Sequence, residues 1–219
     1  MLRDLWNAEA KPSSHNPADK AKASNALTRT SNGLDQFFAS LQDRENLTIL
    51  DLAGASQANI SFITNLGHRI YSDDILHTLD DAFGSGADFL ENQNDPGRIA
   101  SFLRQSLDFP DEHFDGALVW DTLQFLSPAL LKETVDRLGR ILRPQASLLA
   151  FFNAEEKQSS IPAYSYRILN SKTLSLQARG QRKPTQFFNN RTLEKLFQDF
   201  HSVKFFLTRD HLREVIVKR

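Results

Sequence analysis

The sequence predicts a three-layer α/β/α sandwich around a mostly parallel sheet that ends in an antiparallel C-terminal hairpin. Between residues 47 and 152, short apolar runs alternate with stretches of helical spacing, which is the pattern of successive βαβ units. Between residues 203 and 217, two apolar runs flank a turn, which indicates a β-hairpin. A chain of 219 residues, 40% of them hydrophobic, is long enough to bury the core of one such domain.

The chain divides into a predicted flexible arm, residues 1–30, and a single domain, residues 31–219. The arm is rich in Ser, Asn, Lys and Ala and has almost no apolar repeat after Trp6. With Ser31 or Asn32 as its cap, an amphipathic helix is predicted next, because four apolar residues recur at helical spacing: Leu34, Phe37, Phe38 and Leu41.

The first βαβ unit follows this helix. Residues 47–52 predict a strand, and the small residues 53–56 predict a tight turn. Ser56 can cap the next helix and Gly67 can end it, after which residues 69–72 predict a second strand. Strand, turn, helix and strand thus follow one another closely, as a βαβ unit requires.

A second unit comes after an acidic stretch. The stretch 74–107 carries Gly, Asn and Pro96 without a sustained period, so it predicts a loop followed by a helix over residues 96–105. The apolar run 114–120 predicts a buried strand. Ser127 and Pro128 are typical of a helix start, and the helix leads into another predicted strand at residues 146–152.

The C-terminal third predicts antiparallel structure. Residues 164–178 alternate enough to indicate paired strands, and Asn190 can cap a helix before the hairpin at residues 203–217.

Charge is uneven along the chain. Residues 73–115 sum to -9, whereas residues 157–219 sum to +9, which predicts an electrically polarised molecule.

Composition excludes several classes of function. The formal net charge of -1 gives no overall attraction to nucleic acids or membranes, so neither is an expected partner. Cysteine is absent, which removes thiolate nucleophiles and disulfides, and the six histidines show no metal-ligand spacing, so no metal is expected. No apolar run is long enough to cross a bilayer, and the cytoplasm is the expected location.

Ligands of an open parallel sheet bind beyond the carboxyl ends of its strands. The residues that follow predicted strands here are 51–56, Asp73 with Asp74, and 120–122. Gly54 is the only glycine of its turn, which disfavours a dinucleotide site of the G-x-G-x-x-G type. Asp73 follows the second strand, where a carboxylate can accept hydrogen bonds from ribose hydroxyls, with Asp74 as the alternative.

The stretch from about residue 46 to residue 152 resembles the class I S-adenosylmethionine-dependent methyltransferases. The resemblance rests on four segments: the first motif at 47–56, the acidic motif at 71–73, the fourth-strand motif at 109–121 and the turn at 138–146. It implies a Rossmann-like fold with a seven-stranded sheet whose last strand is reversed. It also implies S-adenosylmethionine as the cofactor, lying across the strand ends, and a small-molecule substrate.

Individual residues receive expected roles from their positions. If the substrate needs deprotonation, Asp121 is the expected base. The expected cofactor-binding residues are Asp51, Gly54, Ser56, Asp73, Trp120 and Thr122.

Two alternative functions stay open. The single glycine and the lack of a clear acid after the third strand favour a non-catalytic binding module with a protein or acidic partner. The other alternative is a nucleotide-dependent oxidoreductase.

Overall fold

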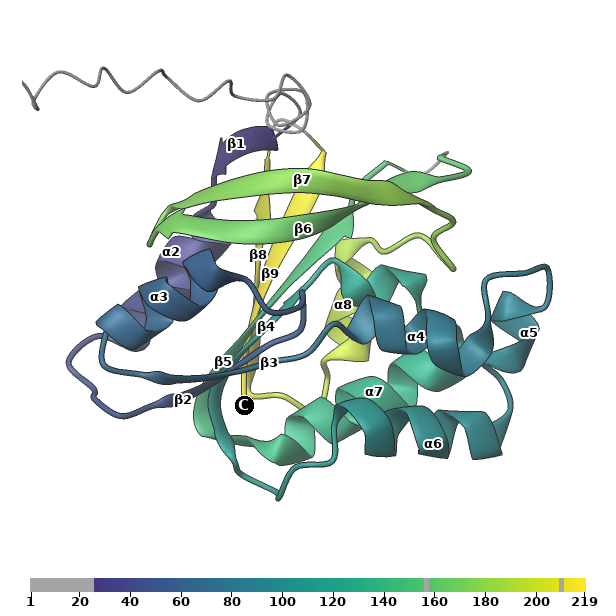
Figure 1. Ribbon diagram of the computed structural model, residues 1–219, viewed down its shortest axis with the longest axis horizontal. Helices are drawn as coiled ribbons and strands as arrows, with labels where there is room; N and C mark the ends of the chain where they lie inside the picture. The colour runs from purple at the N-terminus through teal and green to yellow at the C-terminus, as the bar shows by residue number, and fades with distance from the viewer. Residues whose placement is uncertain (1–25, 156–157, 209–210) are drawn as a thin grey trace, which may run out of the picture.

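The computed structural model describes residues 26–155, 158–208 and 211–219, and these fold around two sheets (Figure 1). The larger sheet has the strand order β3-β2-β4-β5-β9-β8. Its first four strands are parallel, and β9 runs antiparallel to both β5 and β8, which confirms the predicted fold class. These strands are β2 (Thr48–Asp51), β3 (Arg69–Ser72), β4 (Phe114–Trp120), β5 (Leu142–Asn153), β8 (Ser202–Leu207) and β9 (Leu212–Lys218).

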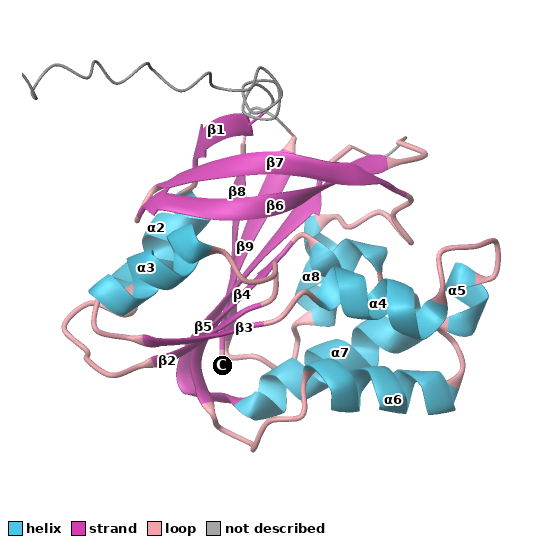
Figure 2. Ribbon diagram, in the orientation of Figure 1, coloured by secondary structure: helices cyan, strands magenta, loops and turns pink. Residues whose placement is uncertain are grey.

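Helices cover both faces of the large sheet (Figure 2). On one face lie α4 (Ile75–Phe83), α5 (Phe89–Asn92), α6 (Pro96–Ser106), α7 (Pro128–Ile141) and α8 (Asn190–Leu196). On the other face lie α2 (Asn32–Ala39) and α3 (Gln57–Asn65). Because successive side chains of a strand point to opposite faces, β4 contributes Ala117 and Val119 to one core, and Leu118 and Trp120 to the other.

A three-stranded antiparallel sheet, in the order β1-β7-β6, lies across the large sheet (Figure 1). It consists of β1 (Ala26–Thr30), β6 (Ile161–Asn170) and β7 (Thr173–Arg182). The last five residues of the predicted arm therefore form a paired strand, and residues 1–25 lie outside the described residues. The β6–β7 hairpin matches the strand pairs that were predicted from residues 164–178.

A buried carboxylate fastens β1 and α2 to β9. Glu214 is fully buried and accepts hydrogen bonds from the Gly33 amide at 2.6 Å and from the Ser31 hydroxyl at 3.0 Å. Its other oxygen pairs with Arg29 at 2.8 Å. Gly33 is required here, because a Cβ at this position would meet the Glu214 side chain and Leu149 at 3.1 Å or less. The N-terminal sheet is thus tied to the main core.

The prediction of a loop over residues 74–95 is wrong, because α4 and α5 lie within it. Four apolar residues of α4 lie buried on one side at helical spacing, and Gly84, with φ of 79°, ends the helix. The helix was not predicted because its apolar repeat is short and lies between acidic residues and a glycine-containing turn. The buried residues are Ile75, Leu76, Leu79 and Phe83.

The expectation of a seven-stranded sheet is also wrong. Within the described residues, no strand lies between α4 and α6, so the large sheet has six strands, and β3 is the edge strand at its parallel end. The intervening residues 84–95 have no apolar β-type run and form turns around α5 instead. The exposed edge is short and starts with Arg69, both of which discourage pairing with another chain. No described helix is long and apolar enough to cross a membrane.

Candidate active site at the strand ends

The turns that follow β2 and β3 are fastened to each other. The Gly54 amide donates to the Asp73 carbonyl at 2.9 Å, and Ala53 forms an isolated antiparallel bridge with Asp74. Gly54 has φ of 89°, a conformation that residues with a side chain rarely adopt, and a Cβ there would meet the Asp74 carboxylate at 3.3 Å. Glycine at this position therefore lets two strand ends meet.

A hollow of about 620 Å³ lies between this turn and the β6–β7 hairpin; we call it the Gly54 hollow. The first turn of α3 forms one wall. Ser56 occupies the N-cap position of α3 without making a side-chain cap, so that the first N–H groups of the helix have no partner from it. The Gln57 side chain does not close the hollow, because it donates to Ser61 at 3.1 Å along the helix. The remaining walls come from Asp74, residues 165–167 and Arg179.

Asp74 and Arg179 meet across the Gly54 hollow. Their two guanidinium–carboxylate bonds measure 2.9 and 2.5 Å, and Asp74 also caps α4 by accepting from the His77 amide at 3.2 Å. Asp73, which the sequence favoured for ribose binding, does not line the hollow. It is partly buried, and burial raises the pKa of its carboxyl. Its role in cofactor binding stays a prediction.

Asp51, at the end of β2, is fully buried and held by three donors. Its carboxylate accepts from the Trp120 indole at 2.6 Å, from the Asn59 side-chain amide at 2.9 Å and from the Ala53 backbone amide at 3.1 Å. Burial raises the pKa of this carboxyl, and the three hydrogen bonds oppose the rise. Asp51 therefore fixes the ends of β2 and β4 relative to α3.

Asp121 follows β4 and lies beneath β6. It is 2% exposed and accepts a hydrogen bond from the Tyr164 amide at 3.2 Å. Burial raises the pKa of its carboxyl from 3.8 to about 7. The buried Tyr166 hydroxyl makes no hydrogen bond of standard geometry with the described residues, yet it lies close enough to Asp121 for burial and this carboxylate to raise its own pKa. Near neutral pH the tyrosine therefore keeps its proton, and Asp121 is the member of the pair that titrates there.

Trp120 and Thr122, on either side of Asp121, are both buried. The Trp120 ring stacks on the Tyr166 ring with centroids 4.6 Å apart and planes inclined by 8°. Trp120 has φ of 56°, which turns the chain sharply into the 3₁₀ helix η1 (Thr122–Phe125). Of these two predicted cofactor-binding residues, neither lines the Gly54 hollow.

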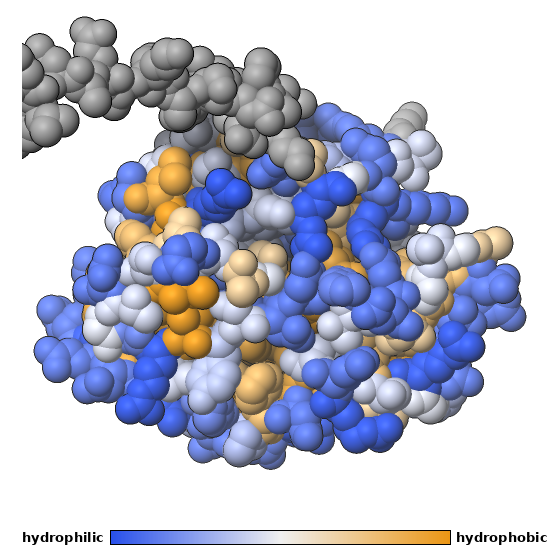
Figure 3. Space-filling model, viewed as in Figure 1, coloured by the Kyte–Doolittle hydropathy of each residue, from blue (hydrophilic) through white to orange (hydrophobic). Residues whose placement is uncertain are grey.

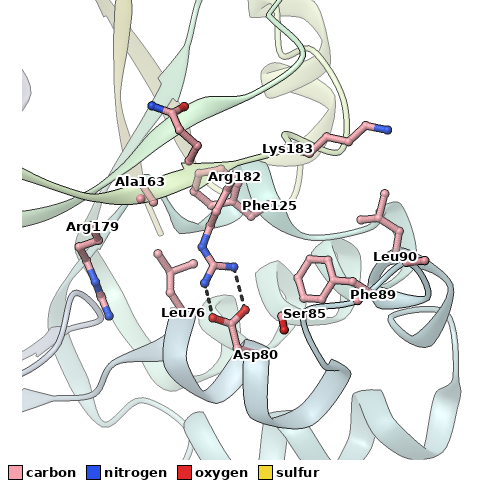
Figure 4. Close-up of a pocket in the computed structure, with 14 residues that line it drawn as sticks. Leu76, Asp80, Ser85, Phe89, Leu90, Phe125, Ala163, Arg179, Arg182 and Lys183 are labelled. Carbon is pink, nitrogen blue, oxygen red and sulfur yellow. Dashed lines mark hydrogen bonds and ion pairs between the residues drawn. The ribbon is translucent and has the colours of Figure 1, made fainter.

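A second hollow, of about 590 Å³, lies between the end of β7 and the helices α4 and α5 (Figure 4); we call it the β7 hollow. Arg182 forms a two-fold ion pair with Asp80 across it. Arg179 lines both hollows, so they adjoin at this side chain. Hydrophilic side chains cover much of the face of the molecule that Figure 3 shows, with hydrophobic side chains between them.

Comparison with known proteins gives a fold and no sequence relative. No protein-family model matches the chain, and no curated protein matches its sequence. A solved S-adenosylmethionine-dependent methyltransferase from Archaeoglobus fulgidus superposes with a TM-score of 0.50 at 11% identity, over 85% of this chain and 91% of that chain. This chain has the class I methyltransferase fold. The resemblance that was noted in the sequence is thereby confirmed at the level of the fold.

Two further solved structures match this chain with TM-scores of 0.47. One is 1,6-didemethyltoxoflavin-N1-methyltransferase from Burkholderia thailandensis with bound 1,6-didemethyltoxoflavin and S-adenosylhomocysteine, which is 13% identical over 85% of this chain and 76% of that chain. The other is an S-adenosylmethionine-dependent methyltransferase from Methanosarcina mazei, 16% identical over 80% of this chain and 93% of that chain.

On this methyltransferase fold, sequence reasoning located the strand ends and missed what covers them. Arg179 and Tyr166 lie more than 90 residues from the Asp74 turn and more than 40 from Asp121, respectively, and only the β6–β7 hairpin brings them there. Asn59 was missed because it lies on a helix face between apolar residues. For Arg179, the one available signal was the basic run after residue 178, which places cations at one end of a predicted strand pair.

Proposed function

We propose that this protein is an S-adenosylmethionine-dependent methyltransferase that acts on a small molecule, with the Gly54 hollow as its cofactor site. The observation that carries the proposal is the position of this hollow: it adjoins the turn after the first parallel strand and the start of the next helix. In open α/β sheets this is where ligands bind, because strand ends leave a crevice and the helix start offers free N–H groups.

The residues of the Gly54 hollow fit this cofactor. Its volume of about 620 Å³ lies within the usual range of small-molecule sites. The first turn of α3 suits the carboxylate of the methionine portion, and the Asp74 carboxylate suits the ribose hydroxyls. At present Arg179 occupies part of the accepting capacity of Asp74, so ribose binding requires this side chain to move aside.

The bound cofactor supplies a methyl group on a sulfonium, and the protein aligns and desolvates the reacting groups. Asp121 is the proposed base, because a carboxyl with a pKa of about 7 can accept a proton near neutral pH. The neighbouring strand connects it with both hollows: Ala163 lines the β7 hollow and Tyr166 lines the Gly54 hollow.

Titration calorimetry with S-adenosylmethionine tests the proposal through two adjacent acids. Asp74→Asn keeps a helix-capping residue but removes the charged acceptor, and we expect it to weaken binding about tenfold, the usual effect of losing a hydrogen bond to a charged group. Asp73→Asn is the matched control, with binding expected to change less than about twofold, because Asp73 does not line the hollow. A larger effect at Asp73 than at Asp74 would mean that Asp73, the residue favoured by the sequence, binds the ribose.

An absence of binding in the unmodified protein would reject this function. Millimolar S-adenosylmethionine that produces no heat, with the fold intact by circular dichroism, would leave the non-catalytic binding module as the surviving alternative. The Asp74–Arg179 ion pair would then be read as a permanent closure of the hollow.

A further inference from the structure

The β7 hollow has an apolar floor beneath a basic rim. Leu76 and Phe125 are buried in its wall, and Phe89 and Leu90 extend from α5 beside it (Figure 4). The segment at the end of β7 places Arg179, Arg182 and Lys183 above these side chains. Among the described residues, Asp80 is the only acid that lines the hollow, so the lining has a formal charge of +2.

Not all of this positive charge is neutralised. Arg182 forms a two-fold ion pair with Asp80, which fixes its guanidinium over the hollow and leaves other N–H groups of the fork free to donate. Lys183 is exposed and has no ion-pair partner within the part of the chain that the structure describes. A ligand with one negative charge would therefore meet an oriented donor and a mobile cation at the same rim.

We propose that the β7 hollow binds the methyl acceptor, and that this acceptor is a small molecule with an apolar, ring-sized body and an anionic group. The apolar body lies on Leu76, Phe89 and Phe125, and the anion faces Arg182 and Lys183. Because Arg179 lines both hollows, an acceptor in this position lies next to the cofactor site. This inference names the substrate class of the proposed methyltransferase and rests on that function.

Two fluorescent probes that share one apolar body separate the charge from the shape. The anionic probe is 8-anilinonaphthalene-1-sulfonate, and the neutral probe is N-phenyl-1-naphthylamine, which lacks the sulfonate. Both are titrated into the 219-residue protein without cofactor. We expect one saturable site that binds the sulfonate more tightly.

Opposite charge changes at the rim should act in opposite directions on the anionic probe. Lys183→Glu should weaken sulfonate binding about fivefold, and Asp80→Asn, which releases the Arg182 fork, should strengthen it by a similar factor, as expected for partly exposed charges. The neutral probe should be unchanged in both variants. Lys195→Glu, the same charge change on α8 away from the hollow, is the matched control and should alter neither probe.

A third variant tests the position of the probe. Gly86 lines the hollow, its backbone is not in a positive-φ conformation, and a Cβ there meets nothing within 4 Å. Gly86→Leu should therefore fill the space without strain and weaken both probes. Unchanged binding in this variant, or equal shifts of both probes in the charge variants, would overturn the proposal. Displacement of the sulfonate probe by adenosine would also overturn it, because the hollow would then belong to the nucleoside.

The probe titrations and the S-adenosylmethionine titration test the acceptor site and the proposed function separately. If S-adenosylmethionine fails to bind while the probes behave as expected, the anion site stands and methyl transfer falls. If the cofactor binds and the probes do not distinguish charge, the methyltransferase stands and this acceptor class falls.

Discussion

Asp51 and Asp121 are both buried acids at the carboxyl ends of adjacent parallel strands, yet their surroundings differ. Asp51 accepts from three donors, one of them the Trp120 indole at 2.6 Å. Asp121 accepts from one backbone amide at 3.2 Å and lies beside a tyrosine hydroxyl. Burial raises both pKa values. The number of donors therefore distinguishes a carboxylate that fastens the structure from one that is available for proton transfer.

Removing the carboxylate of Asp51 should have the largest effect. Asp51→Ala leaves the Trp120 indole and the Asn59 amide buried without this acceptor, and we expect the free energy of unfolding to fall by about 5 kcal/mol, the cost of several unmade buried hydrogen bonds. Urea denaturation measures the loss. Asp81→Ala, at an exposed position of α4, is the control and should cost less than about 0.5 kcal/mol. A loss below about 1 kcal/mol for Asp51→Ala would remove the structural role of this residue.

Ionisation of Asp121 should make the free energy of unfolding depend on pH. Burial raises its pKa from 3.8 to about 7 in the folded state, so the folded protein binds the proton more tightly than the unfolded chain does. The stabilising contribution is present below about pH 4 and is lost as the pH rises through 7. The difference corresponds to at most about 4 kcal/mol. Asp121→Asn should remove this dependence.

Urea denaturation at several pH values between 4 and 8 measures the effect of Asp121→Asn. The variant should gain stability relative to the unmodified protein as the pH increases, since asparagine has no charge to bury. Glu214, whose pKa is also raised by burial, titrates in both proteins and cancels in the difference. Parallel curves for the two proteins would mean that Asp121 ionises normally.

Tyr166→Phe should have the smallest effect on stability and the most specific one. The hydroxyl is buried without a standard hydrogen bond, so its loss should change the free energy of unfolding by less than about 1 kcal/mol. Because this hydroxyl lowers the pKa of Asp121, its removal should move the midpoint of the pH dependence to higher pH. Tyr71→Phe, at an exposed position, is the control. A midpoint that stays in place would separate the two residues.

Local signals in the sequence were sufficient for most elements. Ser31 caps α2 by accepting from the Leu34 amide, and Ser127 followed by Pro128 starts α7, both as their positions predict. The buried run of β4 and the C-terminal hairpin were also predicted, because apolar runs of strand length need no information from distant residues. By contrast, α4 was missed, since its four apolar residues are interrupted by acids.

The candidate site was predictable only in part. No local pattern pairs Asp74 with Arg179 or places Tyr166 next to Asp121, since β6 and β7 could have lain elsewhere on the molecule. Their position follows from tertiary contacts such as those of Asn59, which bonds to the backbone of Tyr166 and Ile168.

The sequence by itself determined that the chain forms βαβ units with small residues and acids at the strand ends, because periodicity and turn chemistry act over a few residues. Only the tertiary structure decided that the sheet has six strands, that the β6–β7 hairpin covers their ends and that two hollows meet at Arg179. Those features depend on which apolar faces pack together, and packing between distant segments leaves no local pattern.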